Sequence, residues 1–292
     1  GCAIVGQTSD LVPADKILYS IRDVTSTVDS VDLITASIIS KKLASGINNL
    51  VLDVKVGRGA LMTNIRQAKK LAKSLVSVSN ASDCKTKALI TSMDDPLSSS
   101  IGNSLEVKTV VEILLGKNKN EQALLDTTIA LSIELYSMVF SEKSHVEIKQ
   151  KIYSLFDSGH VAERFEKMVS ALGGPKHFLS TYKAVLPRAD CVVPIKAKKE
   201  GYITKINTKA LGDILIKMGG GRQKASDKLD LSVGFTEVAK TGKKVSTKTA
   251  LLFMHIADKL FTPSLESEIC DCFSISEREP EKSKDLILQK VS

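Results

Sequence analysis

Apolar residues in the first third of the chain follow two different periods. Residues 50–56, LVLDVKV, and residues 87–93, KALITSM, are apolar runs of strand length. Between them, from Thr63 to about Val78, apolar residues recur on one face with the spacing of a helix. Strands and helices that alternate with short links predict right-handed crossovers and a parallel sheet.

Two more helices are predicted from the signals at their ends. Ser30 can cap a helix that Gly46 stops, with lysines in its last turn. Asn103 and Glu106 form an N-x-x-E variant of the capping box at the start of a helix that ends at Gly116. Together with the strands, these helices give the pattern of an α/β fold.

The pattern changes twice in the second half of the chain. Residues from about Glu121 to Tyr182 have helical periodicity. From Cys191 to about residue 258, short apolar runs separated by glycine and lysine turns predict a β-rich unit. The tail after Leu260 is acidic and basic by turns, which does not favour an ordered element. The sequence therefore predicts a parallel-sheet α/β domain with a β-rich C-terminal unit.

Composition narrows the class of protein. The chain has 292 residues, of which 43% are hydrophobic, enough to build a core. No apolar run approaches the roughly 18–20 residues that a bilayer crossing needs, so we expect a soluble, cytoplasmic protein with no membrane partner. The chain begins at Gly1 with an apolar run, which we interpret as the C-terminal part of a longer protein.

The formal net charge of +8 does not by itself indicate a nucleic-acid partner. The lysines are dispersed, there is no Trp, and aromatic residues make up only 4%, so no stacking platform for bases is predicted. A basic balance also suits an enzyme that attracts phosphate and anionic sugar phosphates. We therefore expect no nucleic-acid partner.

Cysteine and histidine positions do not predict a metal site. The five cysteines are scattered except for Cys270 and Cys272, whose spacing is too tight for the usual zinc pairs. Reduced thiols are expected instead. The four histidines are far apart in the sequence, and we interpret them as structural or solvated. The glycine-containing stretches 57–59 and 219–222 lack the full spacing of a phosphate loop and are predicted to be turns.

One predicted helix carries a serine and a lysine at its border. Ser37 and Lys41 are four residues apart, so they lie on one face of the helix, one turn apart. On spacing alone they are a solvated serine and a lysine favoured by the helix dipole. Arg22 lies before this helix, and its position alone predicts no more than a surface ion pair.

The same stretch carries a resemblance to a known family. Residues 21–46, IRDVTSTVDSVDLITASIISKKLASG, resemble the signature region of thymidine phosphorylases and pyrimidine nucleoside phosphorylases. The resemblance continues through LVLDVKVGRGALM, TKALITSMDDPLSSSIGNSLEVK and LGDILIKMGGGRQKASDKLDLSVGF, and it spans roughly residues 1–258. The GGGRQKASD and SVGF stretches are most similar to the bacterial thymidine phosphorylase branch.

The resemblance implies a domain organisation and a homodimer. Family members combine a small helical domain with a large α/β domain, and the active site lies between them. By position we expect these parts: an α/β start and hinge at 1–13, a helical segment at 14–45, a glycosyltransferase-type α/β domain at 46–190, a β-rich unit at 191–258 and a tail at 259–292.

The resemblance also implies a reaction and a set of base-binding residues. The reaction is the reversible phosphorolysis of thymidine or deoxyuridine to the base and 2-deoxy-D-ribose 1-phosphate, with inorganic phosphate as co-substrate and no organic cofactor. Arg22, Ser37 and Lys41 match the family's pyrimidine-binding residues. Thymine presents two carbonyl oxygens that flank an N3–H, so two cationic donors and a hydroxyl acceptor suit it.

The resemblance leaves part of the active site unassigned. The family's phosphate loop and catalytic histidine lie upstream of the position of Gly1, so we assign no catalytic, phosphate-binding or metal residue in this chain and expect it to be inactive alone. Thr109 stands where some relatives that bind a monovalent cation have Glu, and Arg58 stands where the branch often has serine. Two alternatives stay open: a transferase of the anthranilate phosphoribosyltransferase type, and a binding or carrier module.

Overall fold

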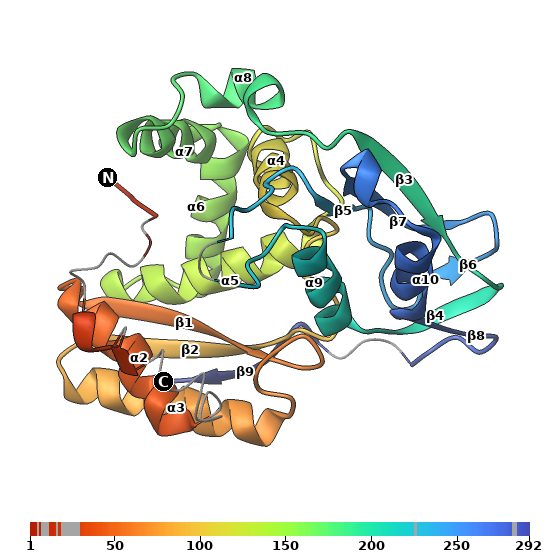
Figure 1. Cartoon of the computed structure of the whole chain (residues 1–292). Coiled ribbons are helices and arrows are strands. Elements are labelled where there is room, and N and C mark those ends of the chain that lie inside the picture. The colour runs from red at the N-terminus through yellow and green to blue at the C-terminus, as the bar shows by residue number, and fades with distance from the viewer. Residues whose placement is uncertain (5, 7–11, 16, 19–29, 225–226, 282–284) are drawn as a thin grey trace. The chain divides into compact units, whose positions relative to one another are not determined.

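The computed structural model forms two compact units. It describes residues 1–4, 6, 12–15, 17–18, 30–224, 227–281 and 285–292. The one-sheet unit comprises residues 2–92, 126–153 and 285–292, and the two-sheet unit comprises Gly1 and residues 93–125 and 154–284. Figure 1 labels the helices and strands of both units.

The one-sheet unit is built around a three-stranded mixed sheet. Its elements are α2 (Val31–Ala44), β1 (Asn49–Val56), α3 (Ile65–Ala81), β2 (Lys85–Ser92), most of α5 (Gln122–Val139), the beginning of α6 (His145–Asp157) and β9 (Ile287–Val291). The strand order is β1-β2-β9. β1 and β2 are parallel, with Asn49 opposite Lys85, whereas β9 runs antiparallel to β2. The predicted parallel pair is confirmed, and the chain's last strand extends it on one edge.

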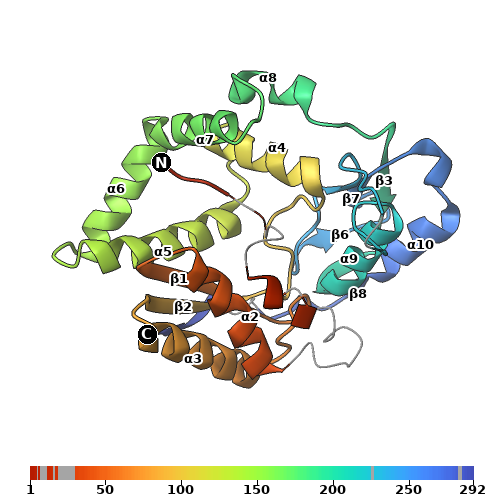
Figure 2. The ribbon, with the colours of Figure 1, turned by 60° about the vertical axis from the view of Figure 1, so that its left-hand side comes forward.

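Helices cover both faces of this sheet. α2 and α3 lie on one side and α5 on the other, as both views show (Figures 1 and 2). α3 buries an apolar stripe against β1 and β2 because its apolar residues recur three and four positions apart. The buried members of that stripe are Ala68, Leu71, Ala72, Leu75 and Val76.

A buried carboxylate joins α5 to two strands of the sheet. Glu134 on α5 accepts hydrogen bonds from Lys87 Nζ on β2 at 3.1 Å and from Lys290 Nζ on β9 at 2.7 Å. Burial raises the pKa of Glu134, but the hydrogen bonds and charges of the two lysines outweigh it, so that pKa lies below its ordinary value. The ion pairs thus fix the last strand and α5 to the same part of the sheet.

The ends of two helices differ in detail from the sequence predictions. α3 begins at Ile65 rather than at Thr63, and the side chain of Asn64 caps it by accepting from Gln67 N at 3.0 Å. Gly102, not Asn103, is the N-cap of α4 (Asn103–Leu114), and Glu106 Oε1 accepts from Gly102 N at 2.9 Å. The predicted capping box is therefore wrong by one residue, because the Asn103 side chain bonds elsewhere in the fold.

The two-sheet unit contains the rest of the helices and strands. They are α4, the end of α6, α7 (His160–Ala171), α8 (Phe178–Val185), β3 (Cys191–Lys196), β4 (Gly201–Ile206), α9 (Thr208–Lys217), β5 (Gly234–Thr236), β6 (Lys244–Val245), β7 (Ala250–Ile256), the 3₁₀ turn η1 (Asp258–Leu260), α10 (Pro263–Asp271) and β8 (Phe273–Ser276). Its sheets have the orders β3-β7-β5 and β6-β4-β8. The helical periodicity of residues 121–182 and the strands expected after Cys191 are confirmed, while α9 was not predicted.

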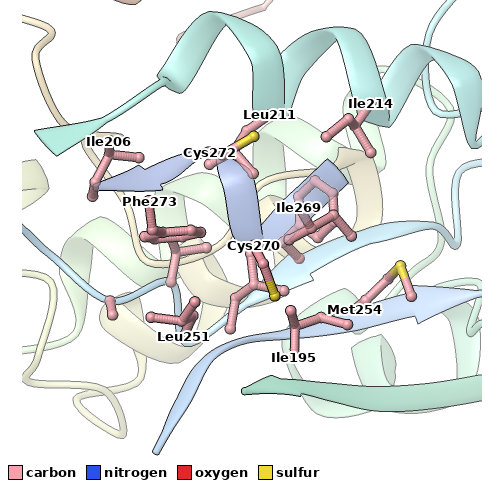
Figure 3. Close-up of a cluster of buried hydrophobic side chains, with 14 of the residues drawn as sticks. Ile195, Ile206, Leu211, Ile214, Leu251, Met254, Ile269, Cys270, Cys272 and Phe273 are labelled. Atoms are coloured by element: carbon pink, nitrogen blue, oxygen red, sulfur yellow. The ribbon is translucent and has the colours of Figure 1, made fainter. Parts of the chain in front are cut away.

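Side chains from both small sheets and from α9 and α10 form one core (Figure 3). Ile195, Met254 and Ile269 are fully or almost fully buried in it. Cys270 and Cys272 also point into this core, and burial raises the pKa of both thiols, that of Cys272 to about 11. They are packed as neutral thiols among apolar side chains.

The described residues after Leu260 include regular elements, although the sequence of this segment did not favour any. It forms α10, β8 and, at the end of the chain, β9. β8 pairs with β4 and β9 pairs with β2, both antiparallel. Such short strands carry little pattern of their own, so only their partners in the fold identify them.

Two glycines allow a close backbone approach between α4 and β5. Ile101 and Phe235 exchange backbone hydrogen bonds of 2.9 and 2.7 Å. The adjacent Gly102 and Gly234 have φ of 128° and 151°, and a Cβ on Gly234 would lie 2.1 Å from the Ile101 carbonyl oxygen. The start of α4 can therefore lie against β5 only because both positions lack a side chain.

Candidate functional site

Ser37 and Lys41 meet on α2 as their spacing predicts. Lys41 Nζ donates a hydrogen bond to Ser37 Oγ at 2.8 Å. The inner side of α2 is fixed by buried Ile34 and Ile39, and by a hydrogen bond of 2.9 Å between the hydroxyls of Thr35 and of Ser74 on α3. Ser37 is only 8% exposed, so it is not the solvated serine that spacing alone favoured.

A third side chain completes this cluster. Asp15, also buried, accepts a hydrogen bond from Lys41 Nζ at 2.7 Å through Oδ2. It lies in a short helical stretch, residues 13–15, far from α2 in the sequence. Spacing could not have identified Asp15, because a contact across 26 residues depends on how the chain returns to α2.

The ammonium of Lys41 retains capacity for a ligand. An ammonium has three N–H donors, and within the described residues two of them are used by Asp15 and Ser37. The side chain of Lys41 is 25% exposed, so solvent reaches it. Among the described residues, Ser37 Oγ accepts one hydrogen bond, which leaves one lone pair and its own proton. The cluster can thus present a fixed cationic donor and a hydroxyl to the same small molecule.

Arg22, the third residue assigned from the family resemblance, lies outside the described residues. Its membership of the cluster therefore stays a prediction. Ser37 and Lys41 are brought together, and Asp15 joins them.

Other positions considered from the sequence have structural surroundings. Thr109 is buried, and its hydroxyl donates to Ser100 Oγ at 2.8 Å. His255 Nε2 shares a hydrogen bond of 2.9 Å with Thr236 Oγ1, and burial lowers the pKa of its ring. In the part of the chain that the structure describes, no three His, Cys, Asp or Glu side chains are grouped as metal ligands.

None of the described helices is both long enough and apolar enough to cross a bilayer.

Two models of known protein families match parts of the chain. Residues 1–162, more than half of the chain, match the model of the glycosyl transferase family, a/b domain. The chain belongs to this family of glycosyl transferases. Residues 202–276 match the pyrimidine nucleoside phosphorylase C-terminal domain. The two matches in this order give the architecture of the pyrimidine nucleoside phosphorylases, and the function is of that pentosyltransferase type.

Proposed function

We propose that this protein takes part in the reversible phosphorolysis of thymidine, and of deoxyuridine, to the base and 2-deoxy-D-ribose 1-phosphate. Inorganic phosphate is the co-substrate, and Arg22, Ser37 and Lys41 hold the pyrimidine. The observation that carries the proposal is the Lys41 ammonium, held between Ser37 Oγ and Asp15 Oδ2, with its third donor not used by any described residue. The family resemblance further supports a cytoplasmic homodimer, which light scattering of the purified protein tests.

The chemistry of the leaving group explains these residues. When the glycosidic bond breaks, the sugar becomes cationic in character and negative charge develops on the base. A cation fixed beside a base carbonyl therefore binds the transition state more strongly than the ground state. Lys41 supplies that charge, and a lone pair of Ser37 Oγ suits the N3–H of the base.

Asp15 acts on the base through Lys41. Its carboxylate takes one ammonium N–H, which limits the positions that the flexible lysine side chain can adopt. Less rotamer entropy is then lost when a ligand binds. Asp15 is therefore a positioning residue in this proposal.

The match to the pyrimidine nucleoside phosphorylase C-terminal domain favours the phosphorylase over the anthranilate phosphoribosyltransferase type. It also favours a pyrimidine nucleoside phosphorylase role for the β-rich segment over a carrier role. Intact mass spectrometry provides a simple check, because a carrier would show a covalently modified lysine.

Base binding is the direct test, since the assigned residues all address the base. We expect the purified chain to bind thymine saturably in isothermal titration calorimetry. Lys41→Ala should weaken binding by about 1.5–3 kcal/mol, or about 10- to 150-fold, as for loss of a charged hydrogen-bond donor. Lys42→Ala is the matched control, because Lys42 is the next residue on α2 and is exposed.

Equal thymine affinity in Lys41→Ala and the unsubstituted protein would reject the base-binding assignment. A comparison of thymine with adenine tests the base class. Phosphate-dependent release of thymine from thymidine tests the reaction in a protein that also carries the family's phosphate loop and histidine, since this chain is expected to be inactive alone. Release of base from a purine nucleoside but not from thymidine would reject the proposed substrate.

A further inference from the structure

A cavity of about 350 Å³ lies in the two-sheet unit, apart in sequence from every base-binding candidate. Residues from the first half of α4, the end of α8, the segment that follows it and strands β3 and β7 line it. Its polar lining includes Lys108, Lys183, Arg188 and His255. Neither Ser37 nor Lys41 contributes to it.

The charge of the lining is one-sided. Three of the side chains are permanent cations near neutral pH, and none of the described residues that line the cavity is acidic. The nearest acid to Lys108 among the ion pairs of the described residues is Glu112, at a long distance of 4.0 Å. Cations of one sign that line a cleft attract anions.

A hydrogen bond to the backbone orients the side chain of Arg188, whose guanidinium has several N–H donors. Its guanidinium donates to the backbone carbonyl oxygen of Lys183, which fixes the side chain at the cavity. A guanidinium carries five N–H groups in a planar fork, and the described residues take up only one of those of Arg188. That fork matches the oxygen pairs of a phosphate.

The positive charge of Lys108 also affects the pKa of His255. Burial lowers the pKa of its ring, and the charge of Lys108 lowers it further. At neutral pH the ring is therefore uncharged and serves as a hydrogen-bonding group, with Nε2 bonded to Thr236 Oγ1. An anion placed in the cavity would offset the charge of Lys108.

The remaining walls are apolar. Leu105, Leu186 and Val192 line the cavity, and Val192 is 53% exposed although it is aliphatic. A volume of this size lies within the range of small-molecule sites, typically about 300–1,000 Å³. It exceeds what inorganic phosphate alone would fill, and the apolar walls suit a carbon skeleton.

We propose that this cavity binds a small organic phosphate, of the size of a sugar phosphate or a nucleoside monophosphate, with its phosphoryl group held by Lys108, Lys183 and Arg188. The site shares no residue with the proposed base site, and the proposal does not depend on that site. It offers the protein a place where a phosphorylated metabolite can bind without competing for the base residues.

Ribose 5-phosphate is the probe, because it carries no base. The purified protein is titrated with ribose 5-phosphate, ribose and inorganic phosphate by calorimetry, at one ionic strength held with sodium chloride. We expect saturable binding of ribose 5-phosphate, weaker binding of inorganic phosphate and none of ribose. Arg188→Ala and Lys108→Ala should each weaken ribose 5-phosphate binding about tenfold, as for loss of a charged hydrogen bond.

Two controls make the result specific. Lys248→Ala removes an exposed lysine of the same unit that does not line the cavity, and it should leave the affinity unchanged. Lys41→Ala should also leave ribose 5-phosphate binding unchanged, so a failure of the base site and a failure of this site are told apart. Arg188 is exposed and Lys108 is 48% exposed, so circular dichroism should show both variants folded.

Several outcomes would overturn the proposal. Ribose 5-phosphate affinity that is unchanged in both cavity variants would do so, as would an equal loss in Lys248→Ala. If inorganic phosphate binds as tightly as ribose 5-phosphate, the cavity does not recognise the organic part of the ligand and the proposal of an organic phosphate is wrong. Binding of a single-stranded RNA without any binding of ribose 5-phosphate would assign the basic lining to nucleic acid instead.

Discussion

Lys41 Nζ lies 2.8 Å from Ser37 Oγ, one turn earlier on α2, and the two side chains form the centre of the candidate base site. The contact follows from helix geometry, because residues four apart share a face. Burial determines how far water reaches this contact, since Ser37 has little access to water and Lys41 is only partly covered.

Asp15→Asn tests whether Asp15 positions Lys41. The substitution keeps the shape of the side chain and removes the charge-assisted bond, so we expect thymine binding to weaken by about 1 kcal/mol, or about fivefold. Calorimetry at pH 7 measures the change. Asp32→Asn, an exposed acid in the first turn of α2, should have no such effect. Binding that is unchanged or tighter in Asp15→Asn would show that Asp15 does not position the lysine.

Arg22→Ala tests the residue assigned from the family resemblance alone. If its guanidinium binds a base carbonyl, the substitution weakens the free energy of thymine binding by about 1.5–3 kcal/mol. Where turnover of thymidine is measured, kcat/KM should fall by an amount that corresponds to an activation barrier about 2–4 kcal/mol higher. Arg66→Ala on the exposed side of α3 is the control. Affinity and turnover equal to those of the control would remove Arg22 from the site.

Gly234→Ala tests the close approach of α4 and β5. With φ of 151° and a Cβ that would lie 2.1 Å from the Ile101 carbonyl oxygen, alanine must break the Ile101–Phe235 bridge. We expect a loss of at least about 2 kcal/mol of unfolding free energy, measured by urea denaturation. Gly212→Ala in α9 is the matched control, since apart from its chain neighbours and the nearby backbone of the helix no atom lies within 4 Å of its added Cβ. Equal stability of the two variants would contradict the geometry.

Glu134→Gln tests the carboxylate that joins α5 to β2 and β9. The pKa of Glu134 is lowered below 4.5 in the folded state, so its contribution to stability is present above about pH 4.5 and is lost as the pH falls through the folded-state pKa. We expect the variant to lose about 1–2 kcal/mol at pH 7 and less at acid pH. Unfolding by urea at both pH values measures this.

The control for that measurement is Glu142→Gln, at an exposed acid that follows α5. It should leave stability unchanged at both pH values. A difference between Glu134→Gln and the unsubstituted protein that does not shrink on acidification would show that the ionised carboxylate is not the source of the stability.

Local pattern predicted the first part of the fold well. The apolar period of α3 and the strand-length runs of β1 and β2 are set by which face each residue must bury, and that information is carried by near neighbours. Asn103 shows where local pattern fails to predict the structure. Its sequence context suited an N-cap, but its side chain donates to the carbonyl oxygen of Gly220, 117 residues away.

By itself the sequence determined the alternating α/β pattern, the helix that places Ser37 beside Lys41, and the family to which the chain belongs. Only the tertiary structure added Asp15 to that pair, set β9 antiparallel to β2, and assembled the cavity around Lys108, Arg188 and His255. The physical reason is the range of the interactions. Contacts one helical turn apart are fixed by backbone geometry, whereas contacts between distant segments exist only after burial has brought the chain back on itself.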